Sequence, residues 1–234
     1  MKLKFLEELE ELRRNTLAAM SQNIKRPLMS MLGSVSALTE AKGEVVEPDR
    51  LGTQLESIRH SGQKLMEFCN KAMLLCELKD GKEIQNESVM VSDVVNEVLR
   101  GLDAEISNKQ LQVSYKNDIK GEVKADHQLL ASALEYIFQN AITFSPAKAR
   151  IIISSVEESG QCVIACEDQG VGLVQRVFKE TMDNENNSYR SGDGVGLNVA
   201  EIIAKLHGGK LSYKNIPTGG VKFSVTIPKN GSSQ

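Results

Sequence analysis

The sequence contains no tryptophan, few other aromatic residues and no strong excess of either charge. Aromatic residues make up 4% of the 234 residues, and the formal net charge is -3. Surfaces that bind nucleic acids need a basic field and commonly use aromatic rings to stack on bases. We therefore do not expect a nucleic acid among the partners.

Long apolar stretches are also missing. No run approaches the roughly 18–20 residues that a membrane-spanning helix needs, and the first residues do not form the apolar part of a signal peptide. The composition, 41% hydrophobic and 25% charged, is that of an ordinary globular protein. We expect a soluble, cytoplasmic chain that meets a membrane only through a segment further upstream.

Cysteine is scarce and is not spaced for metal binding. Cys69 and Cys76 lie seven residues apart in a helical pattern, and Cys162 and Cys166 lie four apart in a predicted strand. Neither pair has the Cys-x-x-Cys spacing that is typical of zinc or redox sites. All four are expected to be buried, reduced thiols.

The first third of the chain has the periodicity of two amphipathic helices. Over residues 17–38, and again over 51–78, apolar side chains recur at steps of three and four. Gly43 and Pro48 lie between the two patterns and interrupt them. The sequence therefore predicts a helical hairpin over residues 15–82.

A single hairpin of this length would leave much apolar surface exposed, so we expect two copies to pair as a four-helix bundle. Before the hairpin, residues 1–14 place Phe5, Leu9 and Leu12 in partial heptad register, which predicts the end of a coiled-coil linker. The sequence thus predicts a homodimer with a sensor or receptor domain upstream.

The rest of the chain alternates short β-branched runs with helical patterns. Strands are predicted at 110–115, 149–156, 162–167, 210–213 and 220–227, and helices at 92–107, 126–143 and 195–207. This alternation predicts a mixed α/β domain over residues 88–228, followed by a disordered tail at 229–234.

Two glycine-rich motifs and an asparagine stand in a specific order in this second domain. Asp-Gln-Gly-Val-Gly at 168–172 follows a predicted strand, and Gly-Asp-Gly-Val-Gly-Leu at 192–197 opens a predicted helix. Asn140 lies 28 residues before the aspartate. Each motif alone is weak, because glycines after strands commonly form plain turns. Together they resemble the ATP-binding domain of sensor histidine kinases and of their gyrase and chaperone relatives.

This resemblance implies an α+β fold, in which the helical hairpin forms a dimeric four-helix bundle and precedes a two-layer α/β sandwich of the histidine-kinase ATPase type. It also implies ATP and Mg²⁺ as ligands. By the resemblance, Asp168 accepts a hydrogen bond from the adenine amino group. Gly170 and Gly172 then let the backbone turn closely beneath the base.

The resemblance assigns the phosphates to the second glycine motif. Gly194, Gly196 and Leu197 would place backbone donors and a helix N-terminus against them. Asn140 would supply an oxygen ligand to Mg²⁺.

Two substitutions near Asn140 depart from the family pattern. The family usually has an asparagine four residues earlier and a lysine three residues later, where this sequence has Tyr136 and Thr143. Because the usual residues help to hold Mg²⁺ and phosphate, we expect weakened phosphate binding. Glu135 could replace the lost metal ligand only if the helix register shifted, since a helix turns about 100° per residue.

The segment Ser-Gln-Asn-Ile-Lys-Arg-Pro-Leu at 21–28 resembles the helix on which sensor histidine kinases phosphorylate themselves. The acceptor position is Gln22, whose amide nitrogen is no nucleophile because its lone pair is delocalised. The family's general base and its water-orienting residue are replaced by Asn23 and Arg26. The residues that shape the helix are kept, and the three chemical groups are absent.

None of the three histidines is expected to replace the acceptor. His60 is predicted on a helix surface, and His127 follows a capping aspartate at a helix start. His207 precedes a glycine at a helix end, where it would act as a cation at the dipole terminus.

The leading hypothesis from the sequence is a pseudokinase. It would be a histidine-kinase-like transducer of a two-component-type pathway that binds ATP and acts through dimerisation and partner binding, without autophosphorylation. A response regulator or another kinase would be its partner. Two alternatives stay open: an active kinase that phosphorylates a partner in trans, and an ordinary histidine kinase with an altered acceptor site. The sequence leaves open whether the chain is an enzyme.

Overall fold

The computed structural model describes residue 21 and residues 23–39, 48–172 and 195–231. The chain divides into two compact units, with the boundary inside one long helix between Leu74 and Leu75. The predicted coiled-coil linker at 1–14 lies outside the described residues.

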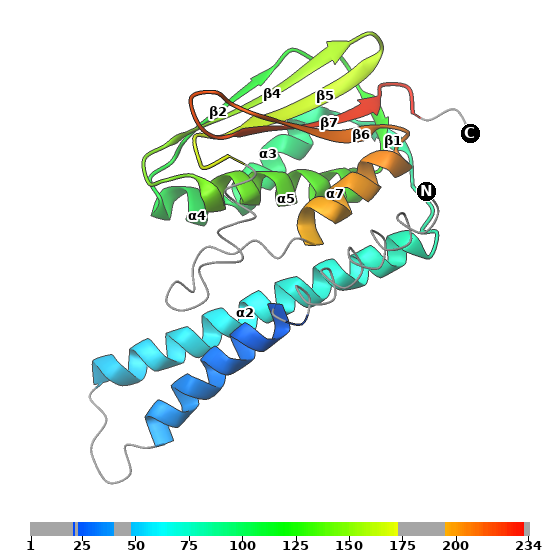
Figure 1. Cartoon of the computed structure of the whole chain (residues 1–234). Coiled ribbons are helices and arrows are strands. Elements are labelled where there is room, and N and C mark those ends of the chain that lie inside the picture. The colour runs from blue at the N-terminus through cyan, green and yellow to red at the C-terminus, as the bar shows by residue number, and fades with distance from the viewer. Residues whose placement is uncertain (1–20, 22, 40–47, 173–194, 232–234) are drawn as a thin grey trace, which may run out of the picture. The chain divides into compact units, whose positions relative to one another are not determined.

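The first unit is a pair of helices. Residues 23–39 are helical, and α2 runs from Pro48 to Lys79 (Figure 1). Proline suits the start of a helix because the N–H that it lacks would have no partner there. Just after the end of α2, Gly81 adopts a φ of +89°, a conformation that side chains disfavour. The two predicted helices are confirmed over the described residues.

The contact between these two helices includes serine hydroxyls. Ser61 donates a hydrogen bond to Ser30 at 3.0 Å. One turn away, Ser34 donates to Ser57 at 3.2 Å. Large apolar side chains stay exposed on the two helices: Ile24, Leu28, Met29, Leu32, Val35, Leu51, Leu55, Met66 and Met73. The hairpin is therefore held in part by small polar contacts, and much of its apolar surface is uncovered within one chain.

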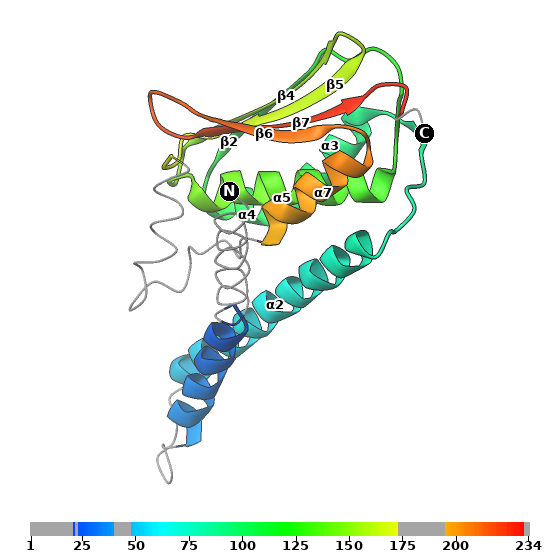
Figure 2. The ribbon, with the colours of Figure 1, turned by 45° about the vertical axis from the view of Figure 1, so that its right-hand side comes forward.

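The second unit is a five-stranded sheet with helices on one face, as the two views agree (Figure 1, Figure 2). The strand order is β2-β4-β5-β7-β6, with β2 and β4 parallel and the other neighbours antiparallel. The strands are β2 (Gln112–Asn117), β4 (Arg150–Glu158), β5 (Gln161–Glu167), β6 (Lys210–Asn215) and β7 (Val221–Pro228). The helices are α3 (Val91–Gly101), α4 (Asp103–Asn108), α5 (His127–Phe144) and α7 (Val195–Leu206). This arrangement confirms the predicted two-layer sandwich.

The core of this unit lies between the helices and the inward face of the sheet. Its largest fully buried side chains are Leu130, Leu134 and Phe138 on α5, and Ile151, Ile153, Ile164 and Phe223 on the strands. Alternation along β4 puts Ile151 and Ile153 inside and Ile152 outside, as the two-residue period of a strand requires. Burying one such side chain contributes about 1.5–3 kcal/mol.

Two parts of the second unit differ from the prediction. The helix predicted at 92–107 is broken, because Leu102 leaves the helical conformation at φ -98° and ψ 4° and turns into the core. A separate antiparallel pair is formed by β1 (Glu87–Val89) and β3 (Val123–Ala125), which the sequence pattern missed. Each of these strands has three residues, too few to show a period.

The cysteine prediction is half correct. Cys162 and Cys166 are buried in β5, and burial raises the pKa of the Cys162 thiol to about 12. Cys69 and Cys76 are exposed on α2, so the prediction of buried thiols was wrong for this pair. The two are seven residues apart, so at about 100° per residue they lie on the same side of α2.

The end of the chain is ordered further than expected. The Lys229 backbone N–H donates to the Gly160 carbonyl at 3.0 Å. Its ammonium group donates to the Lys120 carbonyl at 2.8 Å and lies 2.6 Å from a carboxylate oxygen of Glu157. A disordered tail cannot therefore begin at residue 229; residues 232–234 lie outside the described residues.

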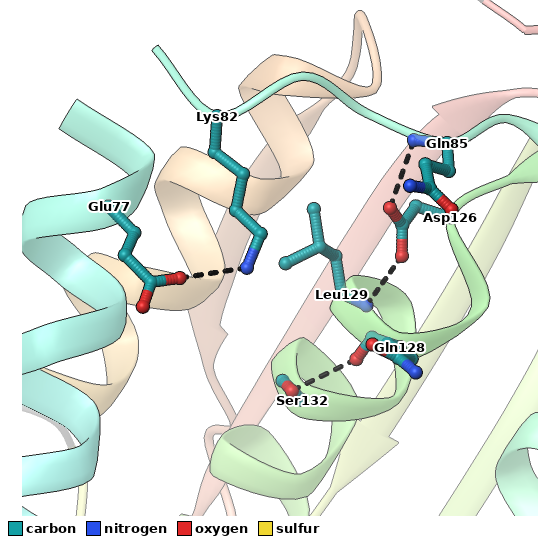
Figure 3. Close-up of polar contacts among 7 residues, drawn as sticks. All are labelled: Glu77, Lys82, Gln85, Asp126, Gln128, Leu129 and Ser132. Carbon is teal, nitrogen blue, oxygen red and sulfur yellow. Dashed lines mark hydrogen bonds and ion pairs between the residues drawn. The ribbon is translucent and has the colours of Figure 1, made fainter. Parts of the chain in front are cut away.

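The start of α5 is fixed by Asp126, which joins three segments. Its carboxylate accepts hydrogen bonds from the Leu129 and Gln85 backbone N–H groups, each at 3.0 Å (Figure 3). Its own N–H donates to Nε2 of His207 at 3.0 Å, and Nδ1 of that ring lies 2.8 Å from the Ile203 carbonyl. His207 is buried and bridges α7 to α5 through the hydrogen bond that its Nε2 accepts.

The turn between β6 and β7 brings two glycines against the end of β5. Gly219 and Gly220 have φ values of +107° and +96°, in the region that favours glycine. A Cβ atom on Gly220 would overlap the carbonyl oxygen of Asp168. No side chain can occupy this position without moving the backbone.

Replacing Asp126 by alanine should lower the free energy of unfolding of the second unit by about 2 kcal/mol, because the helix cap and the acceptor for Gln85 are lost together. Denaturant titration measures this change. Asp118→Ala is the control, since its ion pair with Lys116 is open to water and is expected to contribute less than about 1 kcal/mol. Equal losses in the two variants would contradict the bridging role of Asp126.

Gly220→Ala should destabilise the same unit more than Gly160→Ala. Gly160 also has a positive φ, +75°, but nothing lies within 4 Å of its added Cβ. The control therefore reports the backbone strain alone, about 1–2 kcal/mol. The overlap at Gly220 should add at least about 2 kcal/mol more. Urea midpoints of the two variants give the comparison, and similar midpoints would show that the turn relaxes freely.

Candidate functional site

Asp168 lies at the end of β5 with its carboxylate buried, 1% exposed. Its Oδ1 accepts a hydrogen bond from the Gly170 N–H at 2.8 Å and a longer one from the Val221 N–H at 3.4 Å. A backbone hydrogen bond fixes the same residue, because the Asp168 N–H donates to the Val221 carbonyl at 3.1 Å. The carboxylate is therefore fixed in orientation where β5, β7 and the glycine motif meet.

The first glycine motif passes close to the end of α5. A Cβ atom on Gly170 would lie 2.5 Å from the Phe144 carbonyl oxygen and 3.0 Å from the Asp168 carboxylate. At Gly172 the nearest side chain is Asn215, with 3.5 Å to its Oδ1. Close approach to the Phe144 carbonyl explains the need for glycine at Gly170, and Gly172 is less constrained.

An open hollow of about 410 Å³ adjoins this turn. Its lining residues are Gly170, Val171, Gly172, Asn215, Ile216, Pro217 and Gly219. Much of the wall is backbone of the glycine motif and of the β6–β7 turn. Asp168 is not among the lining residues, but Gly170, whose N–H binds the Asp168 carboxylate, is.

One face of α5 borders both glycine motifs. Tyr136, Asn140 and Phe144 follow one another at four-residue steps, so they lie on the same side of the helix. The Phe144 carbonyl meets Gly170, and the Tyr136 side chain meets Gly196 in the first turn of α7. Half-buried Asn140 lies between these two contacts. The structure thus brings Asn140, Asp168, Gly170 and Gly196 to the same side of the domain.

The described residues offer few oxygen ligands at the expected magnesium site. Glu135 is exposed and lines a different hollow, together with Glu97 and His127, so it does not replace the metal ligand missing at Tyr136. Magnesium prefers several oxygen ligands, commonly carboxylates with phosphates and water. In the described part of the chain no group of three acidic, histidine or cysteine side chains is placed to hold a metal. Of the expected set, Asn140 is the ligand that the described residues retain.

The role of Lys109 could not be predicted from the sequence. Its ammonium group donates to three carbonyl oxygens at the end of α5, those of Ile142 at 2.6 Å, Thr143 at 2.8 Å and Ser145 at 3.2 Å. These carbonyls have no partner inside the helix, and a cation there also opposes the helix dipole. Lys109 therefore fixes the helix end that touches Gly170. No local sequence motif indicates this contact, because Lys109 and the end of α5 are more than 30 residues apart in the chain.

The remaining predicted site residues are placed less completely. Leu197 is half-buried in the first turn of α7, and Gly194 lies outside the described residues. In the hairpin unit, Asn23 is half-buried and Arg26 is exposed on the helix 23–39, and Gln22 lies outside the described residues. His127 follows its capping aspartate as predicted, and its Nε2 lies 3.3 Å from a Glu97 carboxylate oxygen.

Comparison with known proteins agrees with this geometry. The profile of the family described as histidine kinase-, DNA gyrase B- and HSP90-like ATPase matches residues 125–231. The sensor protein KdpD of Clostridium acetobutylicum is 26% identical over 229 residues, which are 95% of this chain and 25% of that protein. The chain thus spans about a quarter of the length of this curated relative. Among the described residues, no helix is long and apolar enough to span a bilayer.

Solved structures show the same fold. The histidine kinase AdeS of Acinetobacter baumannii superposes with a TM-score of 0.68 at 18% identity, covering 89% of this chain and 98% of that one. The histidine kinase ThkA, solved in complex with the response regulator protein TrrA, gives a TM-score of 0.68 at 20% identity, covering 97% and 66%. Residues 125–231 therefore form a domain of the histidine kinase-, DNA gyrase B- and HSP90-like ATPase type, and the chain as a whole is similar to the transmitter region of sensor histidine kinases.

Proposed function

We propose that this chain is a signal transducer of a two-component-type pathway that binds an adenine nucleotide and acts as a pseudokinase. The observation that carries the nucleotide site is the buried Asp168 carboxylate, held by the Gly170 N–H beside the glycine-lined hollow. A carboxylate accepts from the adenine amino group, whereas guanine presents a carbonyl oxygen at that position. This contact selects ATP, or another adenine nucleotide, over guanine nucleotides.

The pseudokinase proposal rests on the acceptor segment. Gln22 offers no nucleophile, and Asn23 and Arg26 stand where the general base and the water-orienting group are expected. We derive no phosphoryl transfer through Mg²⁺, because Asn140 is the one expected ligand retained among the described residues. The output is then binding to a partner, and the ThkA–TrrA complex suggests a response regulator as the class of partner to test.

The domain organisation follows from this role. A coiled-coil linker at 1–14 would carry the signal from an upstream receptor into the hairpin at 15–82, through helix rotation or bending at Pro27. The ATP-binding domain at 88–228 would change its docking in response. The protein would act in the cytoplasm, at a membrane only through its upstream segment.

A homodimer is supported by the hairpin. Leu28, Leu32 and Val35 recur at steps of four and three, and they are 42%, 60% and 45% exposed in one chain. Apolar faces of this extent are normally covered, and pairing two hairpins covers them as a four-helix bundle.

A second candidate is an active kinase that phosphorylates a partner in trans. It is favoured by the same intact Asp168 site and requires Mg-ATP bound firmly enough to orient the γ-phosphate. A third candidate is an ordinary histidine kinase with an altered acceptor site. Restoring a histidine at Gln22 distinguishes this candidate from the other two.

Calorimetry tests the nucleotide site. ATP, with and without Mg²⁺, should bind saturably to the unaltered chain. Asp168→Asn should raise the dissociation constant of ATP at least about tenfold. Asparagine can still accept from Gly170 through Oδ1, but it can turn an NH₂ donor toward the adenine amino group. Asp118→Asn is the surface control. Undiminished binding in Asp168→Asn would remove the proposed adenine contact.

Restoring the acceptor tests the pseudokinase. Gln22→His alone should yield no acid-labile label from radioactive ATP, because Asn23 and Arg26 are unsuited to assist the transfer. The triple variant Gln22→His, Asn23→Glu, Arg26→Thr measures how much the neighbours matter. Labelling of the single variant would favour an ordinary kinase with an altered acceptor, and labelling of the unaltered chain at any histidine would overturn the proposal.

Leu32→Asp should dissociate the homodimer, because it places a charge within the apolar face that pairing would bury. Sedimentation velocity should show the monomer as the main species at micromolar protein. Gln63→Asp is the matched control, since Gln63 is exposed on α2 and does not belong to the apolar set. A monomeric unaltered chain, or a dimeric Leu32→Asp variant, would argue against this interface.

A further inference from the structure

Tyr136 occupies the space beside the first turn of α7. A Cβ atom built on Gly196 would lie 3.3 Å from Cβ of Tyr136, 3.4 Å from Cγ and 3.6 Å from Cδ1. Gly196 is buried, and the tyrosine is half-buried. The near edge of the ring therefore lies against the glycine, and the missing side chain at 196 is what admits it.

The first turn of α7 is also the part of the site best suited to bind an anion. The first N–H groups of a helix have no partner within it, and the helix dipole is positive there. Phosphate groups bind such ends when they can approach the backbone closely. A phenol ring packed at Gly196 leaves less space there for a bulky, highly charged group.

The neighbouring end of α5 offers little compensating charge. The Lys109 ammonium group is bound to the carbonyls of Ile142, Thr143 and Ser145, so its charge is used to cap the helix. Thr143 itself is neutral and half-buried. A triphosphate with its metal ion carries several charges, and placing these charges beside an aromatic ring costs free energy unless they are paired.

The base side of the site has none of these obstacles. The Asp168 carboxylate is fixed, and the hollow beside Gly170 is open. We propose that Tyr136 is a specificity-determining residue, which makes this site select adenine ligands with few phosphate groups, adenosine, AMP or ADP, over Mg-ATP. This inference rests on the adenine site proposed above. The chain would then sense the level of dephosphorylated adenine compounds.

Calorimetric titration of adenosine, ADP and Mg-ATP into the full chain tests this selection, with Tyr136→Asn and Tyr136→Phe as variants. In the unaltered chain Mg-ATP should bind no more tightly than adenosine. Tyr136→Asn should lower the dissociation constant of Mg-ATP at least about tenfold and change that of adenosine by no more than about threefold. The reason is that this variant removes the ring and adds an oxygen ligand one turn from Asn140. Tyr136→Phe keeps the ring and should behave as the unaltered chain.

Each result bears on one of the two proposals. If adenosine fails to bind the unaltered chain, the adenine site itself is wrong and the selectivity falls with it. If adenosine binds but Mg-ATP binds at least about tenfold more tightly, only the role of Tyr136 is overturned. The role of Tyr136 is likewise overturned if Tyr136→Asn strengthens the binding of adenosine and of Mg-ATP equally. Thermal melting checks the fold of each variant, and should Tyr136→Asn not fold, the unaltered chain and Tyr136→Phe still decide between these results.

Discussion

The buried carboxylate of Asp168 is the constraint around which the second unit is arranged. A charged group at this depth needs donors, and the Gly170 and Val221 N–H groups supply them from two different segments. Those bonds require the chain to turn sharply after β5 and require Gly220 to lie against the Asp168 carbonyl. Removing the carboxylate would therefore loosen both walls of the hollow.

Much of this arrangement could be predicted from the sequence, because it depends on local features. Alternation along β4, the aspartate that caps α5 and the glycines after β5 are each visible within a few residues. The break at Leu102 could not be predicted, since a buried leucine fits a continuous helix equally well by pattern. The short pair of β1 and β3 carries too little periodicity to be recognised.

Contacts between distant segments account for the other omissions. Lys109 caps a helix more than 30 residues away, and His207 accepts from Asp126 across 81 residues. Neither residue has a neighbour that signals its role, and only the three-dimensional path of the chain brings the groups together. The exposed pair Cys69 and Cys76 was misjudged for the same reason, because a helical pattern does not show which of its sides another helix covers.

The serine pairs of the hairpin have a mechanical consequence. Ser30 and Ser34 on one helix, like Ser57 and Ser61 on the other, are four residues apart, about one helical turn. If one helix slid past its neighbour by that distance, Ser34 would come opposite Ser61, and one hydroxyl pair would form again. Interlocked large side chains would resist this displacement, whereas hydroxyl groups exchange partners at a cost of about 1 kcal/mol. A one-turn shift therefore keeps one of the two hydroxyl pairs, so the serine contacts offer little resistance to a longitudinal movement along the helices.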